Sequence, residues 1–497
     1  MASKLNIAAL IDGHAASRPN HPAILWRDEV ITYDAFAKSV RQHANQLAAQ
    51  GIQQGDLVGL CLDDTPEYLE ILCALARIGA VTLPMDIRWM PAEVERLANH
   101  FRPSLILTGR DLTGLVGDAK LSMIDETWRA QVATCHSETA PIAEDENLPL
   151  LISLSSGTTG RPTGPMLRHN QMFARVVSQM ASLGFSSYDR FMTATPLYFG
   201  GGRSFSLAQL MLGATLVLHC PPYKMEDLCE AVRRYKVSST FLVPTMLRRL
   251  LELDDSALSA FGGLRQLISS GAPLHQHERL AVRQRITPNY YEYYASTEGG
   301  GISVLSPEGQ DGHPDSVGTR LFRVEVQVVD DNHTPLPNGQ IGAVRYRGPG
   351  VAESFFRDEE ASRAAFKDGW FYPGDLGEFS AGGYLSLRGR KKDMILRAGI
   401  NIYPLELEQI VSQITSIQEL CIFPLPHPDL GEEVAIAYVP AEGHAPADIQ
   451  AEIVAHCRKS LAPYKIPTKF FPLDALPRNS GGKVVRALVL ETVQAIG

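Results

Sequence analysis

The chain has 497 residues, of which 45% are hydrophobic and 20% are charged, which is the ordinary mixture of a globular protein. Domains usually hold about 100 to 200 residues, so this length predicts several structural units and excludes a small disulfide-stabilised scaffold. The formal net charge of −9, from 46 Lys plus Arg against 55 Asp plus Glu, argues against nucleic acid as a partner.

Helical and strand patterns alternate in the first half of the chain. Residues 33–50 and 66–78 show helical spacing of apolar side chains, and the short apolar runs 57–62 and 80–84 follow these segments. The same alternation returns between residues 227 and 253. Such alternation predicts an α/β fold with parallel strands.

The pattern changes in the second half. β-branched alternation such as VEVQVVD occupies residues 316–346 around the turn PLPNGQ and predicts a β-rich subdomain. From about residue 392 helix and strand patterns mix again, which predicts a terminal α+β domain of about 100 residues. We therefore expect a large N-terminal domain over residues 1–391 and a small C-terminal domain over residues 392–497.

The sequence carries no signature of a secretion signal or a transmembrane segment. The first residues lack a basic stretch followed by an apolar core, and the most apolar segment, 68–85, contains Glu70 and Arg77. The seven cysteines form an odd, scattered set without CxxC pairs. These features favour a soluble cytoplasmic protein with reduced thiols.

The segment PLLISLSSGTTGRPTG, residues 149–164, has the pattern of a strand that opens into a loop of hydroxyl and glycine residues. Backbone N–H groups and small hydroxyls suit phosphate oxygens, because glycine lets the backbone approach an anion closely. The loop is not a Walker motif, since no GK[ST] follows. Taken alone, the segment also fits a flexible Ser/Gly loop.

A longer agreement decides between these readings, because the chain resembles the adenylate-forming superfamily of acyl-CoA synthetases, peptide-synthetase adenylation domains and luciferases. The resemblance begins at Ser155, Ser156, Gly157, Thr158, Thr159 and Gly160. It continues in family order through VPTMLRRL (243–250), SSGAPL (269–274), YYASTE (293–298), GWFYPGDLG (369–377), GRKKDMILRAGINIYPLELE (389–408) and PRNSGGK (477–483). It covers essentially the whole chain and is closest to the acid:CoA ligases.

The resemblance implies an AMP-forming acid-thiol ligase that uses ATP, Mg²⁺ and coenzyme A. A carboxylate attacks the α-phosphorus of ATP to give an acyl-adenylate and pyrophosphate, and the acyl group then passes to coenzyme A with release of AMP. Carboxylate and triphosphate repel each other, so such a site needs hydroxyl and amide donors, Mg²⁺ and a positioned cation. The implied partners are a small-molecule carboxylic acid and coenzyme A.

The resemblance also assigns the nucleotide site. Thr158, Thr159 and the glycines around them are expected to hold the β- and γ-phosphates. The remaining assignments are Thr297 to the α-phosphate, Glu298 to Mg²⁺, Asp375 to both ribose hydroxyls with Arg390 beside it, and Gly271, Ala272, Pro273 and Tyr294 to adenine. Glu292 is either an acceptor for the adenine amine or a solvated carboxylate at the rim.

Lys483 is the cation that the resemblance assigns to the carboxylate and the α-phosphate together. Lys392 falls at the family's hinge, where the mobile C-terminal domain rotates after adenylation. The rotation is expected to withdraw Lys483 and to bring in the loop of Ala398, Gly399 and Asn401, which shapes the approach of the thiol.

Two positions depart from the family pattern. Thr163 stands where the phosphate loop commonly has lysine, and Arg161 or Arg168 is the expected replacement for that cation. Ala295 stands where glycine is usual. We expect the first change to affect the affinity for ATP.

The acid pocket is expected around Tyr198, Phe199, Gly202 and Arg203 on one side and Tyr293 and Gly300 on the other. Residues 198–205 contain no carboxylate to pair with an amino group, which disfavours an amino-acid substrate. The glycine runs 200–202 and 299–301 predict open volume between aromatic walls, which favours an aryl or medium-chain aliphatic acid. Arg203 either pairs with the second carboxylate of a dicarboxylic acid or has a structural role.

The sequence leaves a second function open. A stand-alone adenylation enzyme that loads a carrier protein would share every nucleotide motif. The absence of a carrier segment after Lys483 and of a pocket carboxylate favours free coenzyme A. Glu298, Asp375 and Lys483 together argue against a catalytically silent relative, and a homodimer is common in the family.

Overall fold

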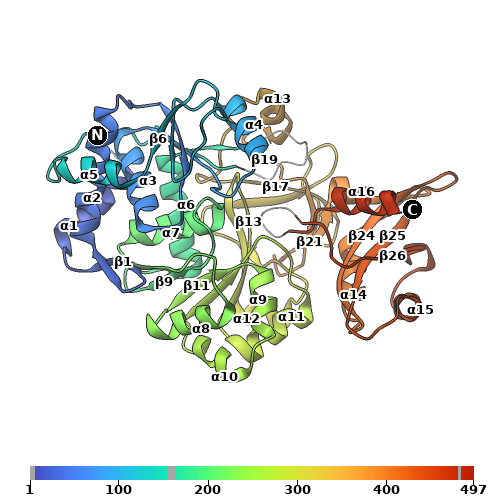
Figure 1. Ribbon diagram of the computed structural model, residues 1–497. Coiled ribbons are helices and arrows are strands. Elements are labelled where there is room, and N and C mark those ends of the chain that lie inside the picture. The colour runs from blue at the N-terminus through green and yellow to red at the C-terminus, as the bar shows by residue number, and fades with distance from the viewer. Residues whose placement is uncertain (1–5, 155–162, 479–482, 497) are drawn as a thin grey trace.

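The computed structural model describes residues 6–154, 163–478 and 483–496, and within them the chain forms four β-sheets (Figure 1). Two largely parallel sheets and a third, antiparallel sheet belong to the N-terminal part. The fourth lies in a separate C-terminal domain, drawn in orange and red at the opposite end of the molecule from the N-terminus (Figure 1). The chain is therefore of the α/β class that the alternating pattern predicts.

The largest sheet has nine strands, and its six central strands are parallel neighbours. Its strand order is β15 (Thr319–Arg320), β14 (Gly300–Leu305), β13 (Tyr290–Ser296), β12 (Gln266–Ser269), β11 (Ser239–Leu242), β9 (Arg190–Thr193), β10 (Thr215–Leu218), β1 (Pro22–Trp26) and β2 (Glu29–Thr32).

The second parallel sheet has six strands and ends in one antiparallel pair. Its order is β6 (Lys120–Met123), β5 (Leu105–Thr108), β3 (Leu57–Cys61), β4 (Val81–Pro84), β7 (Pro149–Ile152) and β8 (Met166–Arg168). The strands expected at 57–62 and 80–84 are β3 and β4.

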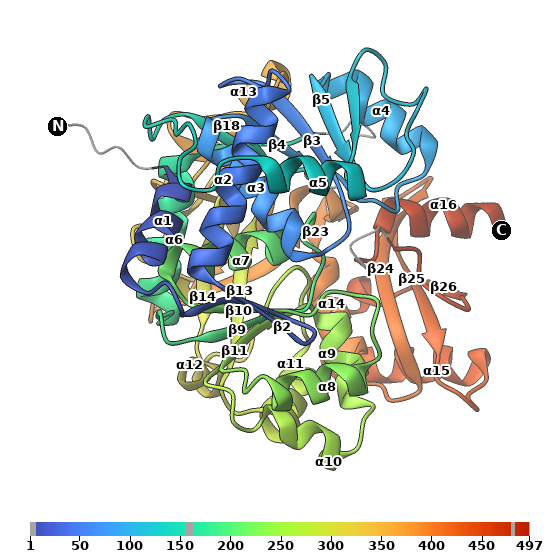
Figure 2. The same ribbon diagram turned by 60° about the vertical axis from the view of Figure 1, so that its left-hand side comes forward.

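Helices cover both faces of the two parallel sheets, so their strands are nearly continuous apolar runs. Between the sheets lie α1 (Ile7–Ser17), α2 (Tyr33–Ala49), α3 (Pro66–Ile78), α6 (His169–Leu183) and α7 (Gly200–Leu212), as Figure 2 shows. On the outer faces lie α4 (Pro91–Phe101) against the smaller sheet, and α8 (Met225–Arg234), α9 (Pro244–Leu251), α10 (Asp255–Leu258) and α11 (Gln276–Ala281) against the larger one. Helix α5 (Glu126–Thr134) packs beside α2.

Local signals explain why these helices start and stop where they do. The hydroxyl of Thr32 accepts a hydrogen bond from the backbone N–H of Ala35 at the start of α2. Pro66 occupies the first turn of α3, and Gly79 ends that helix in the left-handed region at φ +75°.

The third sheet carries the β-rich pattern seen after residue 316. It contains β16 (Glu325–Val329), β17 (Gly342–Arg347), β18 (Phe366–Lys367), β19 (Trp370–Phe371), β20 (Asp375–Phe379) and β21 (Leu385–Arg390). Helices α12 (Pro307–Gly312) and α13 (Glu359–Ala365) lie in the connections.

The C-terminal domain follows the 3₁₀ turn Lys391–Asp393 and has its own hydrophobic core on each face of its sheet. Its strands are β22 (Ile395–Arg397), β23 (Ile400–Ile402), β24 (Ile417–His427), β25 (Gly431–Pro440) and β26 (Lys469–Pro472), and its helices are α14 (Pro404–Val411), α15 (Pro446–Cys457) and α16 (Arg486–Ile496). Along β24, Ile422 faces α14 and α15, and Phe423 faces α16.

Two global features bear on the sequence expectations. All seven cysteines are free thiols. Across the described ranges, none of the helices has the length and apolarity that crossing a membrane requires.

Candidate active site

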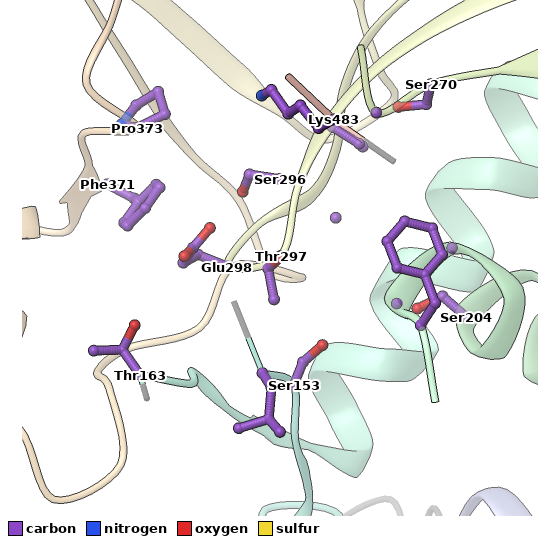
Figure 3. Close-up of a pocket in the computed structure, with 18 of the residues that line it drawn as sticks. Ser153, Thr163, Ser204, Ser270, Ser296, Thr297, Glu298, Phe371, Pro373 and Lys483 are labelled. Carbon is purple, nitrogen blue, oxygen red and sulfur yellow. The ribbon is translucent and has the colours of Figure 1, made fainter. Parts of the chain in front are cut away.

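A cavity of about 990 Å³ opens where the C-terminal domain meets the N-terminal one, and a second cavity of about 860 Å³ adjoins it. Gly271, Tyr293, Asp375, Arg390 and Lys483 line both cavities. Residues that are more than 200 positions apart in the sequence therefore meet in one place (Figure 3).

The end of β13 supplies the centre of the larger cavity. The hydroxyl of Ser296 accepts a hydrogen bond from the backbone N–H of Gly299 at 2.9 Å, which turns the chain sharply between β13 and β14. Thr297 and Glu298 lie on this turn and line the cavity, and Lys483 reaches it from the C-terminal domain (Figure 3). The three residues predicted to be catalytic are thus brought together.

The surroundings of these ionisable groups shift them in opposite directions. Burial raises the pKa of the Glu298 carboxyl, which the Ser296 hydroxyl and two arginines partly offset. Burial in the cleft, together with the neighbouring Arg390, lowers the pKa of the Lys483 ammonium. Both shifts are those of ionisable groups that are partly removed from water, and such groups gather at functional sites.

The predicted ribose site is assembled by two strands of the third sheet. Asp375 on β20 lies directly opposite Arg390 on β21, and the Arg390 Nε donates to Asp375 Oδ1 at 3.3 Å. The Tyr294 hydroxyl donates to the other carboxylate oxygen at 2.5 Å. The predicted adenine residues Gly271, Ala272, Pro273 and Tyr294 line the adjoining cavity, so the adenine and ribose candidates are contiguous.

Glu292 is not a solvated rim carboxylate, so that alternative is wrong. Its side chain is 8% exposed, and its carboxylate pairs with Arg279 at 2.8 Å and accepts a hydrogen bond from the Tyr290 hydroxyl at 3.1 Å. Burial raises its pKa. Glu292 lines the adjoining cavity, and its contact with the adenine amine stays a prediction.

Aromatic side chains line the side of the larger cavity where the acid is predicted to bind. The predicted residues Tyr198, Phe199 and Tyr293 are joined there by Trp89, Phe205 and Phe241, which sequence reasoning missed. The ring of Phe205 lies 5.0 Å from that of Phe241 and 5.8 Å from that of Tyr293. Phe205 ends the segment 198–205, and Phe241 stands two residues before the motif 243–250, but neither belongs to a family motif. The α/β topology brings both of them and Trp89 to this wall.

The expectation that the glycine runs create volume is wrong for most of their members. A Cβ on Gly301 would lie 1.9 Å from the Tyr293 hydroxyl, and one on Gly299 would lie 2.2 Å from the Tyr346 ring. A Cβ on Gly202 would lie 2.5 Å from the Pro196 carbonyl oxygen. These glycines are required by close packing of protein atoms, and of the six only Gly200 could carry a Cβ without a contact closer than 3.7 Å.

Arg203 does not line either cavity, and neither does Gly202. The Arg203 side chain is 1% exposed, and its guanidinium donates to the carbonyl oxygens of Leu197 and Tyr198 and to the Ser153 hydroxyl. Its bonding groups therefore face the protein, which is the structural alternative considered for this residue.

The remaining candidates lie at the edge of the site or outside it. Lys392 lines the adjoining cavity within the 3₁₀ turn, whereas Ala398, Gly399 and Asn401 form the exposed tip of the β22–β23 hairpin and line neither cavity. Ser155, Ser156, Gly157, Thr158, Thr159, Gly160 and Arg161 lie outside the described residues. Thr163 and Ala295 line the larger cavity, but Arg168 binds the Asn147 carbonyl and Glu353 instead.

The residues present fit a magnesium ion that arrives with a nucleotide. Within the described part of the chain, no group of three or more His, Cys, Asp or Glu side chains could hold a metal by itself. Mg²⁺ is commonly held by one or two carboxylates together with substrate phosphates and water. Glu298, a carboxylate at the centre of the cavity, suits that arrangement.

The comparisons with known proteins agree with this geometry. The model of the AMP-binding enzyme family matches residues 11–356, and that of the AMP-binding enzyme C-terminal domain matches residues 406–483. The chain is 29% identical to the indoleacetate–CoA ligase of Aromatoleum aromaticum, with 98% of each chain covered, and 27% identical to the 2-succinylbenzoate–CoA ligase of Bacillus subtilis, with 94% of each covered. Its fold matches ATP-bound MatB from Rhodopseudomonas palustris with a TM-score of 0.91 at 27% identity, covering 99% of this chain and 100% of the other.

Proposed function

Because the chain belongs to the AMP-binding enzyme family, we propose that it is an ATP-dependent acid:CoA ligase, which activates a carboxylic acid as an acyl-adenylate and transfers the acyl group to coenzyme A. One observation carries the proposal. Lys483 of the C-terminal domain lines the same cavity as Glu298 and Asp375 of the N-terminal domain, as adenylation requires. The two relatives named above are CoA ligases of indoleacetate and of 2-succinylbenzoate, and each match covers at least 94% of both chains.

The residues divide the chemistry as follows. Asp375 accepts hydrogen bonds from the ribose, Tyr294 and the 271–273 turn flank the base, and Thr297 donates to the α-phosphate. Glu298 holds Mg²⁺, which neutralises phosphate charge when bound. Lys483 donates to the acid carboxylate and the α-phosphate together, which holds the attacking oxygen in line with phosphorus and offsets the charge that develops there.

The substrate is proposed to be an aryl monocarboxylic acid. Its support is the aromatic wall formed by Trp89, Tyr198, Phe199, Phe205, Phe241 and Tyr293. Arg203 is engaged by protein acceptors, which disfavours a role in binding a second carboxylate. A medium-chain aliphatic acid is the second class to test.

The C-terminal domain, taken as residues 392–497 with Lys392 as the hinge, is proposed to rotate after adenylation. The observed arrangement places Lys483 in the cavity and leaves the tip residues Ala398, Gly399 and Asn401 at the surface. This arrangement suits the first half-reaction, and the second requires the hairpin to move in.

A panel of aryl, aliphatic and dicarboxylic acids, followed by pyrophosphate release with and without coenzyme A, tests the proposal. We expect acid-dependent pyrophosphate release and an acyl-CoA product, with aryl acids preferred. A phosphopantetheine-bearing carrier protein is the competing acceptor, and acyl transfer to it but not to coenzyme A would favour the adenylation-partner alternative. We further propose a cytoplasmic location, supported by the seven free thiols.

A further inference from the structure

Arg175 is a buried cation beneath the centre of the active site. It lies on α6, its side chain is 7% exposed, and it lines the larger cavity with Thr297 and Glu298. None of the motifs that carry the family resemblance includes it. Its position on the buried face of α6, between Met172 and Gln179, is the sequence signal that marks it as unusual.

Among the described residues, the hydrogen bonds of the Arg175 guanidinium all go to backbone carbonyl oxygens. It donates to Glu298 at 2.6 Å, to Gly350 at 2.8 Å and to Thr297 at 3.4 Å. Among the described residues no carboxylate lies within ion-pair distance of it, although most other buried arginines of this chain, such as Arg77 and Arg279, have one. Within the described residues the charge is therefore held by carbonyl dipoles and has no direct ion pair, and the Glu298 carboxylate acts on it only from a greater distance.

Two glycines make room for this side chain. A Cβ on Gly300 would lie 2.9 Å from Arg175 Cδ, and a Cβ on Gly350 would lie 2.8 Å from Arg175 Cγ. Burial lowers the pKa of Arg175 to about 10, which leaves it charged at neutral pH. Removing a cation from water costs free energy. A close-fitting space built for the Arg175 side chain therefore indicates that its charge has a function.

The charged residues that line the cavity indicate what the Arg175 charge does. Its described lining holds four carboxylates, Glu298, Asp358, Glu360 and Asp375, against three cations, Arg175, Arg390 and Lys483. Arg390 is paired with Asp375, and Thr163 is neutral. A nucleotide triphosphate adds several negative charges to this surface, and a cation in a low-dielectric interior acts over a longer range than one in water.

We propose that Arg175 is a positioning residue that fixes the Thr297–Glu298 backbone and supplies a positive charge beneath the polyphosphate of ATP. The inference rests on the proposed function, since it requires a nucleotide in this cavity. Arg175 acts through the turn between β13 and β14 and needs no contact with the phosphates.

Calorimetric titration with ATP and with adenosine in buffer containing EDTA tests the charge separately from the fold and from catalysis. For Arg175→Gln we expect ATP affinity to fall at least about tenfold while adenosine affinity stays within about twofold, because adenosine carries no phosphate. Arg175→Lys keeps the charge and should retain most of the ATP affinity. Gln171→Met is the matched control, since Gln171 ties α6 to the Val351 carbonyl without a charge, and it should leave both affinities unchanged.

Arg175→Met, which removes the charge but keeps an unbranched side chain in the same space, is a second variant in case Arg175→Gln does not fold. It should weaken ATP binding and again spare adenosine. Equal losses for ATP and adenosine in these variants would overturn the inference by reducing Arg175 to a structural residue. A wild-type protein that binds no ATP would overturn the proposed function itself, and the inference with it.

Discussion

The hydroxyl of Tyr294 and the carboxylate of Asp375 form a hydrogen bond of 2.5 Å that joins the largest sheet to the third sheet at the proposed nucleotide site. The bond links the residue proposed to flank adenine with the residue proposed to bind ribose. Burial and the adjacent carboxylate raise the Tyr294 pKa well above its usual range, so the phenol remains a donor.

Asp375→Ala should therefore weaken ATP binding about 10- to 100-fold, because hydrogen bonds to a charged acceptor contribute about 1.5 to 3 kcal/mol. The KM for the acid should change little, since the acyl wall is formed by other elements. Glu360→Ala, which removes another carboxylate of the same cavity, is the control. Calorimetry with unchanged ATP affinity would contradict the ribose assignment.

Lys483→Ala should reduce adenylate formation by about 100-fold or more, as expected for the loss of a preorganised charge at the reacting phosphate. Thioester formation from supplied acyl-adenylate should be spared, because the lysine acts only in the first arrangement of the domains. Lys469→Ala, at an exposed position of the same domain, controls for surface effects. Comparable losses in both half-reactions would refute this role.

Lys392→Pro should slow thioester formation at least about tenfold while adenylation continues, because proline fixes φ at the proposed hinge. Proline is favoured at the first position of such a turn and Lys392 is the second, so a retained adenylation rate is the check that the observed arrangement survives. Lys392→Ala separates loss of the ammonium from loss of rotation. Single-turnover rates for the two half-reactions decide the matter, and an unchanged thiolation rate would place the hinge elsewhere.

Arg203→Met should lower the free energy of unfolding by about 1 to 3 kcal/mol, because it leaves the Leu197 and Tyr198 carbonyl groups without their donor. The ratio of kcat/KM values for matched mono- and dicarboxylic acids should stay within about twofold. Urea denaturation measures the first quantity and the acid panel the second. A hundredfold change in the ratio would restore the dicarboxylate hypothesis.

His169 predicts how stability depends on pH. It is fully buried, its Nδ1 accepts a hydrogen bond from the backbone N–H of Ile7, and burial lowers its pKa to about 4. In the unfolded chain the imidazole takes up a proton at about pH 6.5, whereas in the folded chain it does so only near pH 4. The stability that the neutral, buried imidazole contributes is therefore fully present above pH 6.5 and is lost as the pH falls towards 4.

The free energy of unfolding should fall by about 3 kcal/mol between these two pH values because of His169. His169→Asn, which can accept the Ile7 bond without titrating, should flatten the pH dependence of unfolding between pH 4.5 and 7. Identical slopes for the two proteins would show that His169 is not the responsible group.

Local signals were sufficient to predict the segments but not their arrangement. Helices α2 and α3 could be located because a threonine cap, a first-turn proline and a terminal glycine are visible in the sequence. The pairing of β1 with β10 joins residues about 190 positions apart and depends on the packed helices between the sheets. Such register is set by tertiary contacts, which periodicity does not encode.

The site was predictable to a similar extent. Motif residues such as Thr297, Glu298 and Lys483 meet as expected, whereas the acyl wall was only half anticipated, because Phe205 and Phe241 look like ordinary core residues in the sequence. The meaning of the glycines and of Arg203 depends on which atoms face them. Those neighbours belong to distant elements, so no local pattern could distinguish an open pocket from close packing.

The glycines that are closely packed against protein atoms limit how this enzyme can be redesigned. Side chains introduced at Gly202, Gly299 or Gly301 would collide with the protein frame before they reached a substrate. Gly200, whose Cβ would meet only the Ser153 hydroxyl at 3.7 Å, and Ser204, which lines the same cavity, are the positions where bulk can be added. A library aimed at other acids would be smaller and better folded if it varied these two positions and left the three glycines fixed.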